Sequence, residues 1–350
     1  MKIRYVRISF LTALFFLLLI DLDPAVDGIR VGIDMCLQTV IPSLLPFLIL
    51  TKSITSQLYG LRVPILAKIG EWCGIPRAME SILAVGLMGG YPMGAHMIAD
   101  AWQNSVLNKD SAERMLGFCN NAGPAFIFGV CAALFTKAKT GWLILLIQVL
   151  TSLWCGCILP GKNTEIGGSL GRRSASFVDS VKAAVSSMGY ICGWILCFRV
   201  VLSYIEAYFH INNPMLRAGI FGILELSNGC IALNEIPSEF IRFILANAIL
   251  SFGGLCVWLQ TASVTKGLSL KWFCIGKITQ SLLSIFFSVM IGQFIYDMQG
   301  AMLFAGSILG VLVITWMFAG KKTVAFSKTI LYNKIKTGKK RYQYAVSQKN

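Results

Sequence analysis

The stretch GWLILLIQVLTSLWCGCIL, residues 141–159, decides the fold class. It holds no charged residue and is close to the roughly 20 residues with which an α-helix crosses a bilayer core of about 30 Å. Further apolar runs lie at residues 8–20, 282–295 and 301–319. Backbone in lipid must satisfy its own hydrogen bonds, and these runs lack the alternation of barrel strands. The sequence therefore predicts an all-α, polytopic integral membrane protein.

The composition of the whole chain supports this prediction. Of 350 residues, 56% are hydrophobic and 13% are charged, and the mean hydropathy is +0.69. A soluble domain carries about 25% charged residues. The 11 cysteines lie mostly in apolar runs, so we interpret them as packing residues and expect neither disulfides nor a metal site. Enzyme motifs are absent from the sequence, so we expect no enzyme and no cofactor.

Positive charge is concentrated at the two ends of the chain. The net charge is +15, and residues 321–350 hold nine Lys or Arg and no acidic residue. Lys2, Arg4 and Arg7 precede the run at 8–20, which we interpret as an uncleaved first span. The positive-inside rule predicts that both termini are cytoplasmic, with an even number of crossings. Juxtamembrane lysines are expected to touch anionic lipid, and no nucleic acid is expected as a partner.

The chain divides into two membrane halves. We expect a first half at residues 1–160, a polar linker at 161–176, a second half at 177–320 and a basic cytoplasmic tail at 321–350. About 8–10 membrane segments are expected, some of them broken or re-entrant. The halves echo one another weakly, since a Gly-Pro pair at 123–124 corresponds to the glycine pair at 253–254. We expect them to be inverted repeats, as in many transporters.

Polar or glycine-bearing breaks interrupt the apolar segments. Two prolines, Pro42 and Pro46, should kink or break the helix that spans about residues 28–57. Half-helices beginning after Pro92 and Pro124 would point backbone N–H groups and positive dipole ends into a cavity, where they would suit an anion. The alternative is that the glycines only permit close helix packing.

Polar side chains at these breaks are candidates for a transport site. Glu225, flanked by leucines, is the expected carrier of a coupling proton or cation, the alternative being a carboxylate that hydrogen-bonds a broken helix. His96 could contribute positive charge or relay protons, or be an ordinary packed histidine. No catalytic residue is expected. The predicted substrate-binding residues are Tyr91, Pro92, Gly94, His96, Asn120, Asn121, Gly123, Asn228, Ser251, Gly253, Gly254 and Gln260.

Five motifs, in order along residues 30–320, resemble those of the YlbJ-type sporulation integral membrane proteins. They are IPSLLPF (41–47), GGYPMGA (89–95), FCNNAGPAF (118–126), ELSNG (225–229) and SFGG (251–254). That group belongs with the nucleoside-recognition, or gate, domain proteins. The resemblance implies a role in endospore formation, a place in the mother-cell-derived outer forespore membrane, and transport of dipicolinate toward the spore. It also implies lysine at position 96, where this chain has histidine.

The predicted function is therefore transport of a small organic anion, with dipicolinate as the substrate. One alternative is a non-transporting scaffold for spore cortex or coat assembly, and another is a nucleoside transporter. The coupling ion, the direction of transport and a homo-oligomeric state are left open by the sequence.

Overall fold

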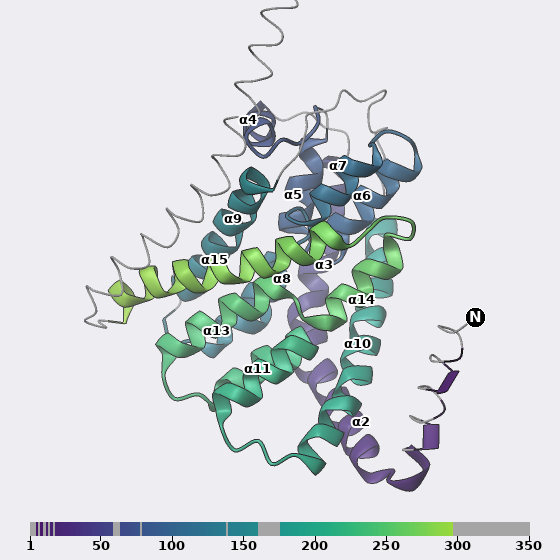
Figure 1. Cartoon of the computed structure of the whole chain (residues 1–350), viewed down its shortest axis with the longest axis vertical. Coiled ribbons are helices and arrows are strands. Elements are labelled where there is room, and N and C mark those ends of the chain that lie inside the picture. The colour runs from purple at the N-terminus through teal and green to yellow at the C-terminus, as the bar shows by residue number, and fades with distance from the viewer. Residues whose placement is uncertain are drawn as a thin grey trace, which may run out of the picture. The chain divides into compact units, whose positions relative to one another are not determined.

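The computed structural model describes residues 21–58, 64–77, 79–137, 139–159 and 176–296, with scattered positions before residue 21. These residues form helices and no strand, which confirms the all-α prediction (Figure 1). Among them, five helices are long and apolar enough to cross a membrane. The apolar run at 301–319, most of the run at 8–20, nearly all of the linker at 161–176 and the tail at 321–350 lie outside the described residues.

The first half is built from one long helix, a helical hairpin, a broken helix and a plain span. The long helix comprises α2 (Asp23–Met35), a π-helical turn η1 (Cys36–Val40) and α3 (Ile41–Leu58), and short α4 (Pro64–Trp72) follows it. The hairpin is α5 (Glu80–Met88) and α6 (Met93–Gln103). The broken helix is α7 (Lys109–Leu116) followed, after a loop, by α8 (Pro124–Phe126), η2 (Ile127–Cys131) and η3 (Ala132–Leu134), and the span is α9 (Lys139–Ile158).

The second half repeats this order of elements. Its long helix is α10 (Phe177–Tyr208), and its hairpin is α11 (Pro214–Leu224) with α12 (Leu226–Ala232), which ends in η4 (Leu233–Glu235). Its broken helix is α13 (Glu239–Phe252) and α14 (Gly254–Val264), and its span is α15 (Lys271–Ile295). Gly253, with φ of 81°, separates α13 from α14, a conformation that glycine adopts without steric cost. The break expected at the glycine pair is therefore present.

The long helices of the two halves pack against each other in opposite directions, in the lower right of Figure 1. The Tyr208 hydroxyl, at the end of α10, donates to Asp21, at the start of α2, over 2.6 Å. Further along, a Cβ at Gly28 would lie 3.0 Å from Val200, and one at Gly32 would lie 2.8 Å from Leu196. As the numbers rise along α2 they fall along α10. The two helices are therefore antiparallel, and the inverted relation of the halves stays a prediction.

Within each half, the break in the hairpin touches the break in the broken helix. A Cβ at Gly123 would lie 2.7 Å from the backbone nitrogen of Gly90. In the second half, a Cβ at Gly254 would lie 3.2 Å from the nitrogen of Leu226 and 3.3 Å from Cα of Glu225. Backbones approach this closely only where side chains are small. The four breaks therefore form two pairs.

Pro42 and Pro46 do not end their helix. The π turn Cys36–Val40 directly precedes the segment that holds Pro42, and the helix continues through Pro46 to Leu58. A π turn changes the local hydrogen-bond register and is a usual cause of a kink. The helix is therefore not broken at either proline, and the expected kink stays a prediction.

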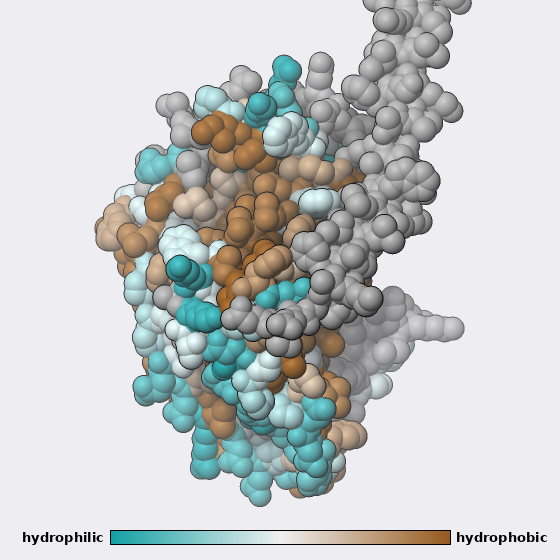
Figure 2. Space-filling view, turned by 90° about the vertical axis from the view of Figure 1, so that its left-hand side faces the viewer, coloured by the Kyte–Doolittle hydropathy of each residue, from teal (hydrophilic) through white to brown (hydrophobic). Residues whose placement is uncertain are grey.

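Apolar side chains cover much of the surface. Brown residues dominate the upper and middle parts of the face shown in Figure 2. On α9, Trp142, Leu146 and Leu150 are spaced four residues apart and are all exposed. Such a stripe suits contact with lipid tails.

Candidate functional site

Two adjoining cavities lie among the helix breaks. The deeper one has a volume of about 70 Å³ and the wider one about 300 Å³. They share part of their walls. The shared lining residues are Leu48, Gly89, Tyr91, Ile191 and Gln260.

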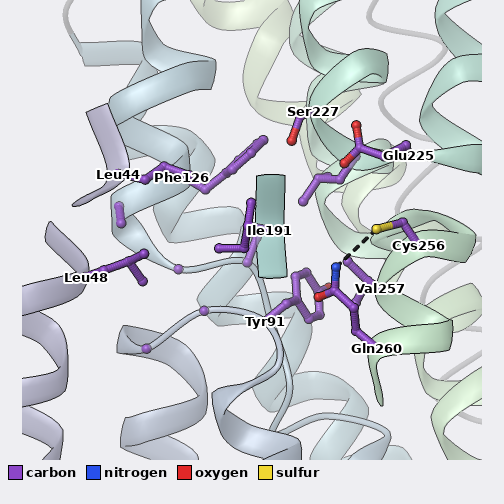
Figure 3. Close-up of a pocket in the computed structure, with 16 residues that line it drawn as sticks. Leu44, Leu48, Tyr91, Phe126, Ile191, Glu225, Ser227, Cys256, Val257 and Gln260 are labelled. Carbon is purple, nitrogen blue, oxygen red and sulfur yellow. Dashed lines mark hydrogen bonds between the residues drawn. The ribbon is translucent and has the colours of Figure 1, made fainter. Parts of the chain in front are cut away.

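The deeper cavity is lined from both halves of the chain. Figure 3 shows Leu44, Leu48 and Phe126 facing Glu225 and Gln260 across it, with Ile191 of α10 between them. Backbone from two breaks of the first half also lines it, through residues 89–90 and 122–123. Most of the lining is apolar, and a few polar groups are placed where helices are interrupted. This arrangement is typical of a small-molecule site in a membrane transporter.

The wider cavity carries the basic side chains. Lys52 of α3 and His96 of α6 both line it, together with the aromatic rings of Tyr190 and Trp194. The Lys52 ammonium lies 3.2 Å from the sulfur of Met93 and is half-buried. A cation beside flat aromatic surfaces can bind a planar anion through both charge and stacking. The lysine expected at position 96 is absent, but Lys52 brings an ammonium group to the same cavity.

Glu225 lies where α11 ends and α12 begins. Its side chain is buried and lines the deeper cavity. Oε2 accepts hydrogen bonds from the backbone nitrogen of Asn228 at 2.7 Å and from its Nδ2 at 2.8 Å. Glu225 therefore caps α12, as a carboxylate at a helix start commonly does. These hydrogen bonds are those of the alternative interpretation, a carboxylate bonded to a broken helix, and the coupling role of Glu225 stays a prediction.

A buried network centred on Lys277 joins α15 to the first-half breaks. The Lys277 ammonium donates to the Asn120 carbonyl at 2.6 Å, to Asn121 Oδ1 at 3.1 Å and to Gln280 Oε1 at 2.7 Å. It also lies 3.3 Å from the Tyr91 hydroxyl and over the Tyr91 ring. Lys277 has no exposed surface. Through Tyr91, this buried cation contacts the shared wall of the two cavities.

A close helix crossing places Lys277 in this position. A Cβ at Gly276 would lie 2.1 Å from the carbonyl oxygen of Gly117, so α15 can pass the end of α7 only with glycine there. The next residue on α15 is then directed to the Asn120–Asn121 loop that follows α7.

The predicted site residues fall into two sets. Six line a cavity: Tyr91, Pro92, His96, Gly123, Glu225 and Gln260. Seven are not among the cavity-lining residues: Gly94, Asn120, Asn121, Asn228, Ser251, Gly253 and Gly254. The second set lies behind the cavity walls, where its members bond or pack against the breaks.

The second set supports the first. Asn120 Nδ2 donates to Thr261 at 3.0 Å, and the Ser251 hydroxyl donates to Gln148 at 3.1 Å. A Cβ at Gly94 would lie 1.8 Å from the carbonyl oxygen of Cys119, so the glycine permits contact between α6 and that loop. A Cβ at Gly253 would lie 3.3 Å from the Tyr91 ring. These glycines have the packing role that was the alternative interpretation of the sequence.

The sequence motifs did not point to Lys52 or Lys277. A signal for Lys277 is nevertheless present, because α15 carries a polar stripe at helical spacing inside an apolar span. All four members of the stripe are fully buried: Lys277, Gln280, Ser284 and Ser288. Lys52 sits in a more polar part of α3, and only the fold shows that it faces the same cavity as His96.

Comparison with known proteins gives one informative relative. The chain is 23% identical to the sporulation integral membrane protein YlbJ of Bacillus subtilis (strain 168), over 77% of this chain and 78% of the relative. This relative supports the assignment of the chain to the YlbJ type. No protein-family model matches it, and no solved structure matches it significantly. The YlbJ-type resemblance of the motifs is thus confirmed, and the protein is integral to a membrane.

Proposed function

We propose that this YlbJ-type protein transports a small organic anion across a membrane during sporulation. The sporulation role is supported by the relative, which is a sporulation integral membrane protein. The observation that carries the transport proposal is the pair of adjoining cavities, lined by interrupted helices of both halves. Interrupted segments at matching positions in two halves are the usual location of a transporter's substrate site.

The proposed substrate is dipicolinate, carried toward the forespore across its outer membrane. Dipicolinate is a planar dianion, and the wider cavity offers Lys52 and His96 for carboxylates with the rings of Tyr190 and Trp194 for the flat face. A volume of about 300 Å³ is at the lower end of the range of about 300–1,000 Å³ for ligand pockets. The deeper cavity, at about 70 Å³, is smaller, so onward passage requires the breaks to move.

Glu225 is the proposed coupling group. An anion that enters the deeper cavity approaches the Glu225 carboxylate, and two negative charges repel strongly in an apolar surrounding. A proton or small cation that accompanies the anion would remove this repulsion. This geometry supports co-transport of a positive charge with the dianion.

The test is uptake of labelled dipicolinate into liposomes that hold the purified protein. We expect saturable uptake that nucleosides do not reduce. Lys52→Met should raise the half-saturating concentration about tenfold or more, because a charge-assisted hydrogen bond is lost. Lys271→Met is the matched control, since Lys271 is exposed at the start of α15 and lines neither cavity.

Two other outcomes would replace the proposal. Competition by nucleosides, with uptake of labelled nucleoside, would make the protein a nucleoside transporter. A folded, inserted protein that takes up neither solute would favour a scaffold for cortex or coat assembly.

A further inference from the structure

The oxygen atoms around the Lys277 ammonium form a cage. One is a backbone carbonyl, from Asn120, and the others belong to the side chains of Asn121, Gln280 and Tyr91, at 2.6 to 3.3 Å from the nitrogen. None of the four is a carboxylate. Among the residues that the structure describes, no ion pair involves Lys277.

Other hydrogen bonds hold the orientation of two members of the cage, Asn121 and Tyr91. Asn121 Nδ2 donates to the carbonyl of Phe118 at 2.8 Å and to the Ser152 hydroxyl at 3.1 Å, which leaves Oδ1 facing Lys277. The Tyr91 hydroxyl donates to the carbonyl of Leu250 at 3.1 Å, so its oxygen accepts from Lys277. Four acceptors around one nitrogen match the three N–H donors of an ammonium ion better than the two of a neutral amine.

A charge at this depth needs a reason. An apolar residue would pack in α15 without the desolvation penalty of a buried cation, and removing such charges in favour of apolar groups is often neutral or stabilising. Ionisable groups inside membrane segments are therefore functional candidates. Three members of the cage, Tyr91, Asn120 and Asn121, also belong to the breaks of the interrupted helices.

A shell of neutral carbonyl, amide and hydroxyl oxygens is what a monovalent cation binds when it sheds its water, as the carbonyl rings of ion filters show. We infer that the cage is a site for a small monovalent cation, and that Lys277 fills it permanently as part of the chain. Lys277 then holds the Tyr91 side chain in the wall of both cavities. Only that side chain separates the positive charge of Lys277 from the cavities. Given the proposed transport function, on which this consequence rests, uptake needs no sodium ion in this cage.

The cage can be tested without any substrate, by thermal unfolding of the purified protein in detergent. Lys277→Ala removes the ammonium and leaves space, so we expect a lower unfolding midpoint in choline chloride. Sodium or ethylammonium chloride at equal ionic strength should restore at least half of that loss, because a ligand that binds the folded state stabilises it. Wild type and Lys271→Ala should have the same midpoint in all three salts.

Lys277→Met separates the cage from a general salt effect. Methionine fills the space without donating, so the unfolding midpoint of this variant should gain nothing from sodium or ethylammonium, whatever its midpoint in choline chloride. An equal gain in Lys277→Met and Lys277→Ala would overturn the inference, as would a Lys277→Ala midpoint that is the same in all three salts.

Wild-type protein supplies a test that does not depend on the folding of a variant. Dipicolinate uptake that a proton gradient drives should change less than twofold when sodium is replaced by choline on both sides of the liposome, and a tenfold fall in that proton-driven uptake would refute a permanently filled cage. If dipicolinate is not carried at all but the Lys277→Ala midpoint rises with sodium, the cage stands and the proposed function fails. If uptake is independent of sodium but Lys277→Ala shows no response to sodium, the proposed function stands and the cage fails.

Discussion

Two buried cations, Arg114 and Lys277, are solvated by the protein in different ways. Within the described part of the chain, the Arg114 guanidinium donates only to backbone carbonyls, at 2.5 to 3.1 Å, and it stacks over Phe118. Lys277 donates to one carbonyl and to side-chain oxygens, and reaches the cavity wall through Tyr91. The Arg114 acceptors are the carbonyls of Cys73, Gly74, Gly156 and Leu159.

The difference distinguishes a structural anchor, which is Arg114 with its four carbonyls, from a working centre, by which we mean Lys277, its cage and the adjoining cavities. Backbone carbonyls move only with their segments, so Arg114 fixes the turn after α4, the end of α9 and α7 relative to one another. Three of the Lys277 acceptors are side-chain oxygens, and one of them belongs to Gln280, whose Nε2 has no hydrogen-bond partner among the described residues, so the Lys277 cage is held less rigidly. A buried charge by itself therefore does not identify a transport site, and what surrounds the charge decides its role.

The largest effect should come from breaking the anchor. Arg114→Met leaves four carbonyls without their donor, and each unsatisfied buried group costs about 1–3 kcal/mol. We expect the free energy of unfolding to fall by at least about 3 kcal/mol, measured by denaturant or thermal unfolding in detergent. Uptake per folded molecule should remain near normal. A stable Arg114→Met protein that does not transport would place Arg114 in the working centre instead.

Two carboxylates extend the comparison. Glu113, beside the anchor, accepts a hydrogen bond from the backbone of Ser269 at 2.8 Å and lines neither cavity, whereas Glu225 lines the deeper one. Glu225→Gln should lower uptake at least about a hundredfold, a loss of the size that one essential polar group causes. Its stability should change by less than about 1 kcal/mol, because glutamine can still accept the bond that caps α12.

Glu113→Gln is the control and should leave uptake unchanged. If Glu225→Gln transports normally, then Glu225 only caps α12 and the coupling proposal is wrong. Uptake that becomes independent of a proton gradient in Glu225→Gln, but not in Glu113→Gln, would strengthen it.

Tyr91→Phe should show how far the cage and the cavity depend on each other. The change removes the hydroxyl that accepts from Lys277 and donates to Leu250, but it keeps the ring in both cavity walls. We expect uptake to fall about tenfold, which corresponds to about 1.4 kcal/mol, with a stability loss of about 1 kcal/mol. Tyr190→Phe, in the wider cavity only, is the matched control. An equal loss in both variants would contradict a special role for the bond to Lys277.

Much of the fold could be predicted from the sequence, because long apolar segments and their breaks are local signals. The glycine pair at 253–254, expected to interrupt an apolar segment, separates α13 from α14 at Gly253. The site was harder to predict. Lys277 and Asn120 are in contact although 157 positions separate them in the chain. The local sequence around Lys277 does not indicate which helix break the polar face of α15 contacts. We expected Asn120 and Asn121 to bind the substrate because polar residues inside apolar segments are usually interpreted as functional. In the structure they hold Lys277.

The smallest effect should come from Ser152, which touches the cage only indirectly. Its hydroxyl donates to the carbonyl of Phe118 at 2.6 Å and accepts from Asn121 Nδ2 at 3.1 Å. Asn121 keeps its second bond, to Phe118, in Ser152→Ala, so its Oδ1 should still face Lys277. We expect a stability loss of about 0.5–1.5 kcal/mol by thermal unfolding and uptake within about twofold of wild type. A large fall in uptake without a stability loss would mean that the orientation of Asn121 depends on Ser152, and that the working centre extends as far as α9.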